Sequence, residues 1–174
     1  AAYDQNSGMV FIHDRAYLFS YDIGTNTITQ RNTNNVATDY SKTAVVDPNR
    51  RLYIIIGGGE VISYDISGTA GYPLTQRNTT GGSSIVSSEN PGLAYDPVGK
   101  QIVAWNGGNT IYFLNTGTWQ WTSTTFAGGP AAVTNGTFGR FGYVPSFGVF
   151  VTYNSVDANG HTLCGRLGPL TGRG

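Results

Sequence analysis

The stretches TAVVDPNRRLYIIIGG (residues 43–58) and GLAYDPVGKQIVAWNGG (residues 92–108) decide the fold, because both read as an apolar run, a turn and a second apolar run. In each, an Asp-Pro pair opens the turn, where proline pre-sets the backbone for a reversal. Two further stretches align with them, AAYDQNSGMVFIHD (residues 1–14) and RFGYVPSFGVFVTYNS (residues 140–155). The equivalent positions Tyr3, Val46, Tyr95 and Tyr143 are 43, 49 and 48 residues apart. This period predicts the four-stranded blades of a β-propeller, which are usually about 40 to 50 residues long.

The rest of each repeat contains the pattern of a third and a fourth strand. The third strands are expected in AYLFSYD, EVISYD and TIYFLN, which place Tyr21-Asp22, Tyr64-Asp65 and Leu114-Asn115 at matching positions. The fourth strands are expected in TITQRNT, PLTQRNT and WQWTSTT, which start at residues 27, 73 and 119. Their alternation of polar and apolar residues suits a half-exposed outer strand. We therefore predict an all-β propeller of about four blades, at residues 1–42, 43–91, 92–137 and 138–163.

Composition supports this fold class and narrows the choice of partners. The chain has 174 residues, among them 25 glycines and 11 tyrosines, and only 11% of the residues are charged, as in short strands joined by tight turns. A net charge of zero does not favour nucleic acid or an anionic membrane as a partner. No apolar stretch approaches the roughly 20 residues of a membrane-spanning helix. Low charge and abundant Thr, Asn and Gly suit a secreted or periplasmic protein of bacterial type.

The repeats resemble the kelch repeat, in which the second strand ends in Gly-Gly, the third carries Tyr-Asp and the fourth carries Trp. Gly57-Gly58, Tyr64-Asp65, Gly107-Gly108 and Trp121 fit this pattern. The first repeat instead has Asp14-Arg15 at the Gly-Gly position, and Thr29 and Thr75 are interpreted as replacing the Trp. The resemblance implies a propeller and leaves the activity open, since this fold carries interaction domains, lectin-like modules and oxidases.

The ends of the chain predict an incomplete ring. The chain lacks an initial Met and a signal-peptide pattern, and the repeat stops after Leu163, so we expect a fragment or half-propeller with an irregular, non-native tail at residues 164–174. Four blades could close on themselves, or an open half-ring could pair with a second copy. We favour the homodimer, because the strands of the first repeat, such as residues 10–12, are as apolar as the internal ones and do not cap the array.

Candidate ligand-binding residues lie in turns that a propeller places on its rim or near its channel. They are His13, Asp14, Arg15, Asn106, Arg140 and Asn154. For the residue triplet at 13–15, the alternative that we favour is a solvated turn in which Asp14 accepts hydrogen bonds from its own backbone. Asn106 and Asn154 could bind a sugar or a peptide, or could serve turns. Arg140 could bind a carboxylate or phosphate at the channel mouth, or could form a salt bridge.

Metal ligands are sparse in this sequence. Only two histidines, His13 and His161, and one cysteine, Cys164, are present, so a zinc site within one chain is not expected and no internal disulfide can form. An oxygen-lined calcium site remains an alternative, with Asp39, Glu89 and Asp157 as candidate ligands. We otherwise expect no cofactor.

The large aromatic side chains are interpreted mainly as packing residues. Trp105 occupies the position of Ile56 and Tyr153 near the end of the second strand, so we predict that it is buried between blades. Trp119 and Trp121 alternate on the expected outer strand, so both rings should face the same side, against a neighbour or as a carbohydrate platform.

The sequence contains no signature of a known catalytic site. No Gly-x-Ser-x-Gly elbow, His-Glu-x-x-His helix or phosphate loop occurs, and two histidines cannot supply a copper site of the galactose-oxidase type. The leading hypothesis is a non-catalytic propeller module that presents a rim to a glycan or protein partner. The alternative is a hydrolase of lactone, phosphate or sulfate esters, with its site at the channel of an assembled propeller.

Overall fold

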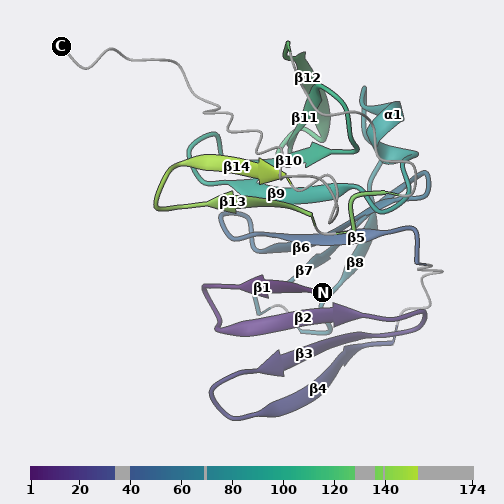
Figure 1. The fold of residues 1–174 in the computed structure, drawn as a ribbon. Helices are drawn as coiled ribbons and strands as arrows, with labels where there is room; N and C mark the ends of the chain where they lie inside the picture. Colours follow the sequence, from purple (N-terminus) through teal and green to yellow (C-terminus); the bar gives the residue numbers. More distant parts are fainter. Residues whose placement is uncertain (34–39, 69, 128–135, 139, 153–174) are drawn as a thin grey trace.

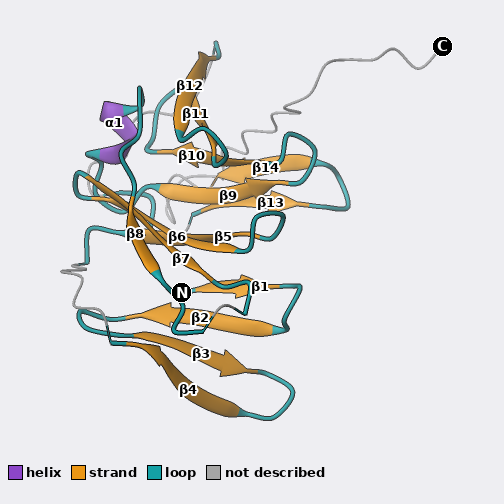
Figure 2. Ribbon diagram, turned by 180° about the vertical axis from the view of Figure 1, so that it is seen from behind, coloured by secondary structure: helices purple, strands orange, loops and turns teal. Residues whose placement is uncertain are grey.

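Four antiparallel sheets contain all the strands in the described part of the chain (Figures 1 and 2). The computed structural model describes residues 1–33, 40–68, 70–127, 136–138 and 140–152. The first sheet has the order β1 (Ala2–Asp4), β2 (Met9–His13), β3 (Leu18–Asp22) and β4 (Thr27–Asn32). The second has β5 (Thr43–Asp47), β6 (Leu52–Gly57), β7 (Glu60–Asp65) and β8 (Leu74–Gln76). The third has β9 (Gly92–Asp96), β10 (Gln101–Trp105), β11 (Thr110–Asn115) and β12 (Gln120–Thr125), and the fourth has β13 (Phe141–Val144) and β14 (Val149–Thr152).

Helix is limited, among these residues, to the single turn α1 (Ser83–Val86), which lies in the connection between the second and third sheets. No helix in the described ranges is long and apolar enough to span a membrane.

The predicted equivalence of the repeats is confirmed by strand register. Tyr3 lies opposite Val10, Val46 opposite Tyr53, Tyr95 opposite Ile102 and Tyr143 opposite Phe150. The row continues on the third strand with Tyr21, Tyr64 and Leu114. It ends on the fourth strand with Ile28, Leu74 and Trp121. Residues directly opposite one another share a face of the sheet, so each row lies on the same face of its blade.

The assignment of Thr29 and Thr75 to the tryptophan position was wrong by one residue. Ile28 and Leu74 hold that position, whereas Thr29 lies opposite Ser20 and Thr75 opposite Ser63. A shift of one residue moves a side chain to the other face of a strand. Trp121 is therefore a core residue that replaces an aliphatic residue of the other blades.

The sheets pack face to face as the blades of a propeller do. The inner strands β1, β5, β9 and β13 belong to successive sheets and neighbour one another in that order (Figure 1). Three apolar clusters fill the spaces between the blades. We number the sheets as blades 1 to 4 in chain order. Phe11 packs with Tyr53 between blades 1 and 2, and Val45 packs with Ile102 between blades 2 and 3. The first sheet, β1–β4, lies at one end of the molecule in both views (Figures 1 and 2).

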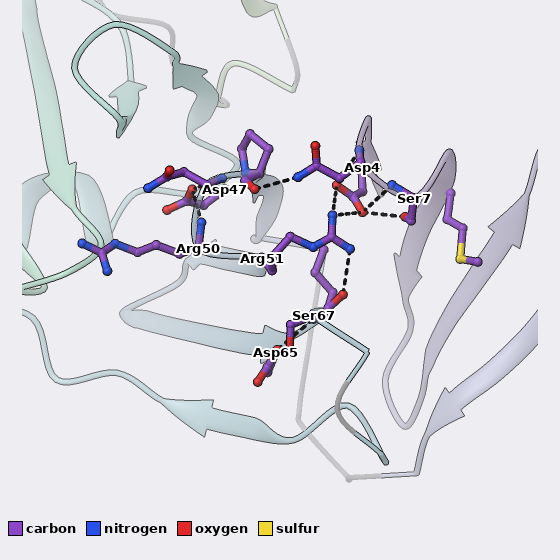
Figure 3. Close-up of polar contacts among 12 residues, drawn as sticks. Asp4, Ser7, Asp47, Arg50, Arg51, Asp65 and Ser67 are labelled. Atoms are coloured by element: carbon purple, nitrogen blue, oxygen red, sulfur yellow. Dashed lines mark hydrogen bonds and ion pairs between the residues drawn. The ribbon is translucent and has the colours of Figure 1, made fainter.

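A buried aspartate ends each of the first three inner strands and fixes the following turn. Asp4, Asp47 and Asp96 accept hydrogen bonds from backbone N–H groups two residues ahead, at 2.9 to 3.2 Å. Two of them also contact the next blade. Arg51 binds both carboxylate oxygens of Asp4, at 2.9 and 2.7 Å (Figure 3), and Thr116 Oγ1 donates to Asp47 at 2.6 Å. These carboxylates therefore connect blades as well as shaping turns.

Candidate functional site

One end of the blades carries most of the residues that the sequence singled out. We call it the candidate rim, and it comprises the β2–β3, β6–β7 and β10–β11 turns together with the described residues just before β5, β9 and β13. Since strands alternate in direction, the end of every second strand and the start of every inner strand meet at the same edge. Five of the six predicted ligand-binding residues lie on this rim: His13, Asp14, Arg15, Asn106 and Arg140. Asn154 lies outside the described residues.

A backbone ladder joins successive blades at the candidate rim. The Asn90 N–H donates to the Ser41 carbonyl at 2.8 Å, and the Thr137 N–H donates to the Asn90 carbonyl at 2.9 Å. Thr137 Oγ1 donates to the same carbonyl at 3.0 Å, and Phe138 N–H approaches it at 3.4 Å. Gly57 lies against this ladder, because a Cβ at its position would collide with the Ser41 carbonyl, and its φ of 135° also favours glycine. Backbone hydrogen bonds and a close backbone contact therefore connect these segments at the rim.

The triplet at residues 13–15 has two different roles. Asp14 accepts the N–H groups of Ala16 and Tyr17, both at 2.8 Å, which is the turn-forming role expected of it. His13 points to the neighbouring blade, where its Nδ1 lies 2.7 Å from the Tyr53 hydroxyl. Arg15 is exposed. His13 is thus a blade-contact residue, while Asp14 and Arg15 face solvent.

The environment of His13 predicts a pH dependence of stability. Burial, reinforced by the positive charges of the chain N-terminus and Lys42 and opposed by Asp14, lowers the pKa of His13 to about 4. A histidine in the unfolded chain has a pKa near 6.5. The stability that the neutral form of His13 contributes to the fold is therefore fully present above that pH and is lost as the pH falls toward 4. Through His13, the parent chain should lose roughly 2 to 3 kcal/mol of unfolding free energy between pH 8 and pH 4.5, and the His13→Gln variant should lose that much less. Urea unfolding at the two pH values measures the difference. His161→Gln serves as the control. An equal loss of unfolding free energy between the two pH values in both variants would contradict the prediction.

Asn106 and Arg140 form hydrogen bonds with other residues of the candidate rim. Asn106 Nδ2 donates to Ser88 Oγ at 2.7 Å, and Ser88 belongs to the segment that precedes β9. The Arg140 guanidinium donates from Nε to the Thr137 carbonyl at 2.9 Å and from Nη2 to the Gly136 carbonyl at 2.8 Å. Arg140 therefore braces the segment before β13 and brings a positive charge to the rim next to the backbone ladder.

Of the three predicted calcium ligands, only Glu89 lies in the described part of the chain. Glu89 is exposed on the candidate rim, whereas Asp39 and Asp157 lie outside the described part of the chain, as do His161 and Cys164. Within the described ranges, no group of three His, Cys, Asp or Glu side chains is placed to hold a metal ion.

Exposed aromatic residues on the candidate rim were missed by the sequence analysis. Tyr40 is 87% exposed and Phe138 is 60% exposed, and Tyr17 at the β2–β3 turn is also exposed. Tyr40 precedes Ser41 and Phe138 follows Thr137, so these two exposed residues adjoin the two ends of the backbone ladder. No sequence signal separated them from core aromatics, because neither residue lies in a strand whose alternation would indicate which side it faces. Large exposed rings beside polar groups are typical of binding surfaces.

The three tryptophans pack rather than line the rim. Trp105 is completely buried and stacks on Phe141 of the next blade, which confirms its predicted place between blades. Trp121 is buried between blades 2 and 3. Trp119 was wrongly placed on the outer strand: it lies in the turn before β12 with a φ of 57°, and Arg77 lies over its ring at 4.4 Å. Trp119 and Trp121 therefore do not form a flat carbohydrate platform together.

Comparison with known proteins supports the fold. No protein-family model matches the chain, and no curated protein is significantly similar to it. Among solved structures, the hydrazine synthase of Kuenenia stuttgartiensis, a propeller-containing protein, is similar to 90% of this chain with a TM-score of 0.57 and 15% identity. A chain of the mitotic checkpoint complex is similar to 88% of it with a TM-score of 0.48 and 14% identity.

This chain spans only 42% and 56% of the length of those two chains. Together with the four sheets, the first likeness shows an all-β, propeller-like fold, and at this identity it shows the fold alone.

Proposed function

We propose that the chain is a binding module of kelch-like propeller type that presents the candidate rim to a glycan or protein partner. The observation that carries this proposal is the exposure of two aromatic residues, Tyr40 and Phe138, next to the two ends of the backbone ladder. Large aromatic side chains next to a hydrogen-bonded backbone are frequent anchors of binding interfaces.

Polar groups around these rings fit the same role. Arg140 supplies a positive charge beside Phe138, and Asp14 with Arg15 supplies both signs of charge at the neighbouring β2–β3 turn. A sugar offers hydroxyl groups to such side chains and its apolar face to an aromatic ring. A protein partner would use the same rings as buried anchors and the charges as a polar rim. Low overall charge is consistent with a secreted or periplasmic module.

The test compares binding of the chain and its rim variants. Binding is measured on a glycan array and against a display library of folded domains, and each binder found is titrated in solution. We expect Tyr40→Ala and Phe138→Ala each to weaken the binding about tenfold, which corresponds to about 1.4 kcal/mol. Because both side chains are largely exposed, neither change should alter the unfolding midpoint.

Phe147→Ala is the matched control, because Phe147 is 76% exposed but lies in the β13–β14 turn at the opposite end of the blades. This variant should bind as the parent chain does. Binders that are insensitive to Tyr40 and Phe138 would contradict the proposal. Turnover of an activated lactone, phosphate or sulfate ester by the chain, lost on treatment with a chelator, would instead favour the hydrolase alternative.

A further inference from the structure

The segment TQRNT occurs twice in the chain, at residues 29–33 and 75–79, and the function proposed for the rim does not use it. The first copy ends β4, the outer strand of blade 1, and the second copy ends β8, the outer strand of blade 2. The arginines of the two copies, Arg31 and Arg77, are both half-buried. Each arginine contacts one residue of its own blade and one residue of the next blade.

The contact within the blade is a hydrogen bond to a buried serine of the third strand. Arg31 Nε donates to Ser20 Oγ at 2.7 Å, and Arg77 Nε donates to Ser63 Oγ at 2.8 Å. The two serines are equivalent, because each directly precedes the tyrosine of its row. Their opposite neighbours on the second strand pack against the next blade, so the serines face that blade as well. The hydrogen bond therefore holds the planar guanidinium at the junction between two blades.

The contact with the next blade is made to an aromatic ring. The guanidinium carbon of Arg31 lies 5.4 Å from the centre of the Tyr72 ring, and that of Arg77 lies 4.4 Å from the centre of the Trp119 ring. Both distances are within the roughly 6 Å at which the face of an aromatic ring attracts a cation. Tyr72 and Trp119 are equivalent, because each lies two positions before the fourth-strand residue of its row. The same cation–π contact thus joins blade 1 to blade 2 and blade 2 to blade 3.

The turn that carries this ring does not itself require an aromatic residue. Tyr72 and Trp119 have left-handed φ of 46° and 57°, a conformation that asparagine adopts more readily than bulky residues. Asn26 is the equivalent residue of blade 1, with a φ of 54°. The aromatic residues of blades 2 and 3 therefore have a conformational cost, which their contact with an arginine offsets.

The backbone of each aromatic residue is bound by the preceding blade too. Asn32 Nδ2 donates to the Tyr72 carbonyl at 2.7 Å, and the Thr80 N–H donates to the Trp119 carbonyl at 3.1 Å. Both donors follow the arginine of their own copy within three residues. The Thr80 carbonyl also accepts the Trp121 N–H at 2.9 Å, so the connection to blade 3 pairs with β12. The ring and the carbonyl of the aromatic residue are both engaged across the junction.

From this repeated arrangement we infer that each TQRNT segment forms a clamp that couples the opening of neighbouring blades at their outer edges. We define the clamp as the arginine, the serine of its own blade and the aromatic residue of the next blade. Since opening of either outer edge breaks the same contact, the two edges open together. Contacts between neighbours are the main coupling between the units of a repeat protein. Blade 3 has Thr124 at the position of Arg77, so the described part of the chain contains two clamps. This inference is independent of the proposed function of the rim.

Hydrogen exchange of the whole chain, followed by mass spectrometry of its peptides, tests the coupling at the second clamp. Arg77→Met removes the cation and keeps the apolar part of the side chain. We expect exchange to accelerate about tenfold on both sides of the junction, in residues 77–82 and 119–122, which corresponds to about 1.4 kcal/mol. Trp119→Asn gives blade 3 the turn residue of blade 1 and should accelerate exchange in the same two segments. Because both changes remove one contact, the effect of the double variant should be smaller than the product of the two single effects.

The first clamp provides an independent test that includes a change in the opposite direction. Tyr72→Trp gives blade 2 the residue of blade 3, and tryptophan is the better partner for a cation, so exchange in residues 31–33 and 71–74 should slow by about threefold. Tyr72→Asn should instead accelerate exchange in these two segments. Neither change should affect the segments at the second clamp.

Arg15→Met is the matched control, because Arg15 is an exposed arginine of blade 1 outside both clamps. This variant should exchange as the parent chain does. Unchanged exchange in both Arg31→Met and Arg77→Met would overturn the inference, as would acceleration confined to the blade that carries the change. Effects of Arg77→Met and Trp119→Asn that multiply in full would show that each residue stabilises only its own blade. If Trp119→Asn does not fold, Arg31→Met and Tyr72→Asn provide the same comparison.

Discussion

Trp105→Ala is expected to lower the free energy of unfolding by about 3 to 5 kcal/mol, as is typical of large-to-small changes in a packed core. Trp105 is completely buried, and its ring stacks on Phe141 at a centroid distance of 6.3 Å. Its indole N–H also donates to the Gly108 carbonyl at 2.9 Å, so truncation leaves a cavity and an unpaired carbonyl. Urea unfolding followed by circular dichroism measures the change.

Two further variants separate the causes of that loss. Trp105→Phe keeps an aromatic ring on Phe141 but removes the donor to Gly108, and we expect it to cost about 1 to 2 kcal/mol. Phe147→Ala removes an exposed ring and should change the unfolding free energy by less than about 0.5 kcal/mol. A Trp105→Ala variant as stable as this control would show that the junction between blades 3 and 4 does not support the fold.

The repeat could be predicted from the sequence because each blade repeats the same backbone requirements. Gly8, Arg51, Lys100 and Gly148 all have left-handed φ, between 52° and 70°, at the same place in the first turn of each blade. The strands that flank this turn alternate in a fixed register, so Tyr3, Val46, Tyr95 and Tyr143 could be aligned without a structure.

The fourth strands were harder to predict, since the connections that lead to them differ in length. Four residues separate Asp22 from Thr27, whereas eight separate Asp65 from Leu74. The shared TQRNT stretch suggested an alignment with Trp121 that the structure shifts by one residue.

The candidate rim was only partly predictable for a different reason. Turn residues such as Asp14 carry local signals, since an aspartate accepts hydrogen bonds from the next few N–H groups. The contact of His13 with Tyr53 joins residues 40 apart, and its chemistry depends on packing between blades. Tyr40 and Phe138 lie outside the strands, so no alternation in the local sequence indicates that they are exposed.

The ion pair between Asp4 and Arg51 gives the second large effect, because Asp4 is completely buried (Figure 3). Arg51→Met removes the positive charge but leaves the carboxylate in place. Breaking one side of a buried pair usually costs about 3 to 5 kcal/mol. Asp4 keeps hydrogen bonds from the N–H groups of Asn6 and Ser7, so we expect the lower part of this range. Arg51 also donates to the Ile66 carbonyl at 3.0 Å, and that bond is lost with it.

A double-mutant cycle isolates the ion pair from these other contacts. Asp4→Asn alone should also destabilise the chain, but adding it to Arg51→Met should cost less than the sum of the two changes, because the unpaired charge is gone. We expect a coupling of about 1 to 3 kcal/mol from urea unfolding of the four proteins. Arg50→Met, at the exposed neighbouring position, should change stability by less than about 0.5 kcal/mol. Additive effects of Asp4→Asn and Arg51→Met would mean that Asp4 only shapes its own turn and does not tie blade 1 to blade 2.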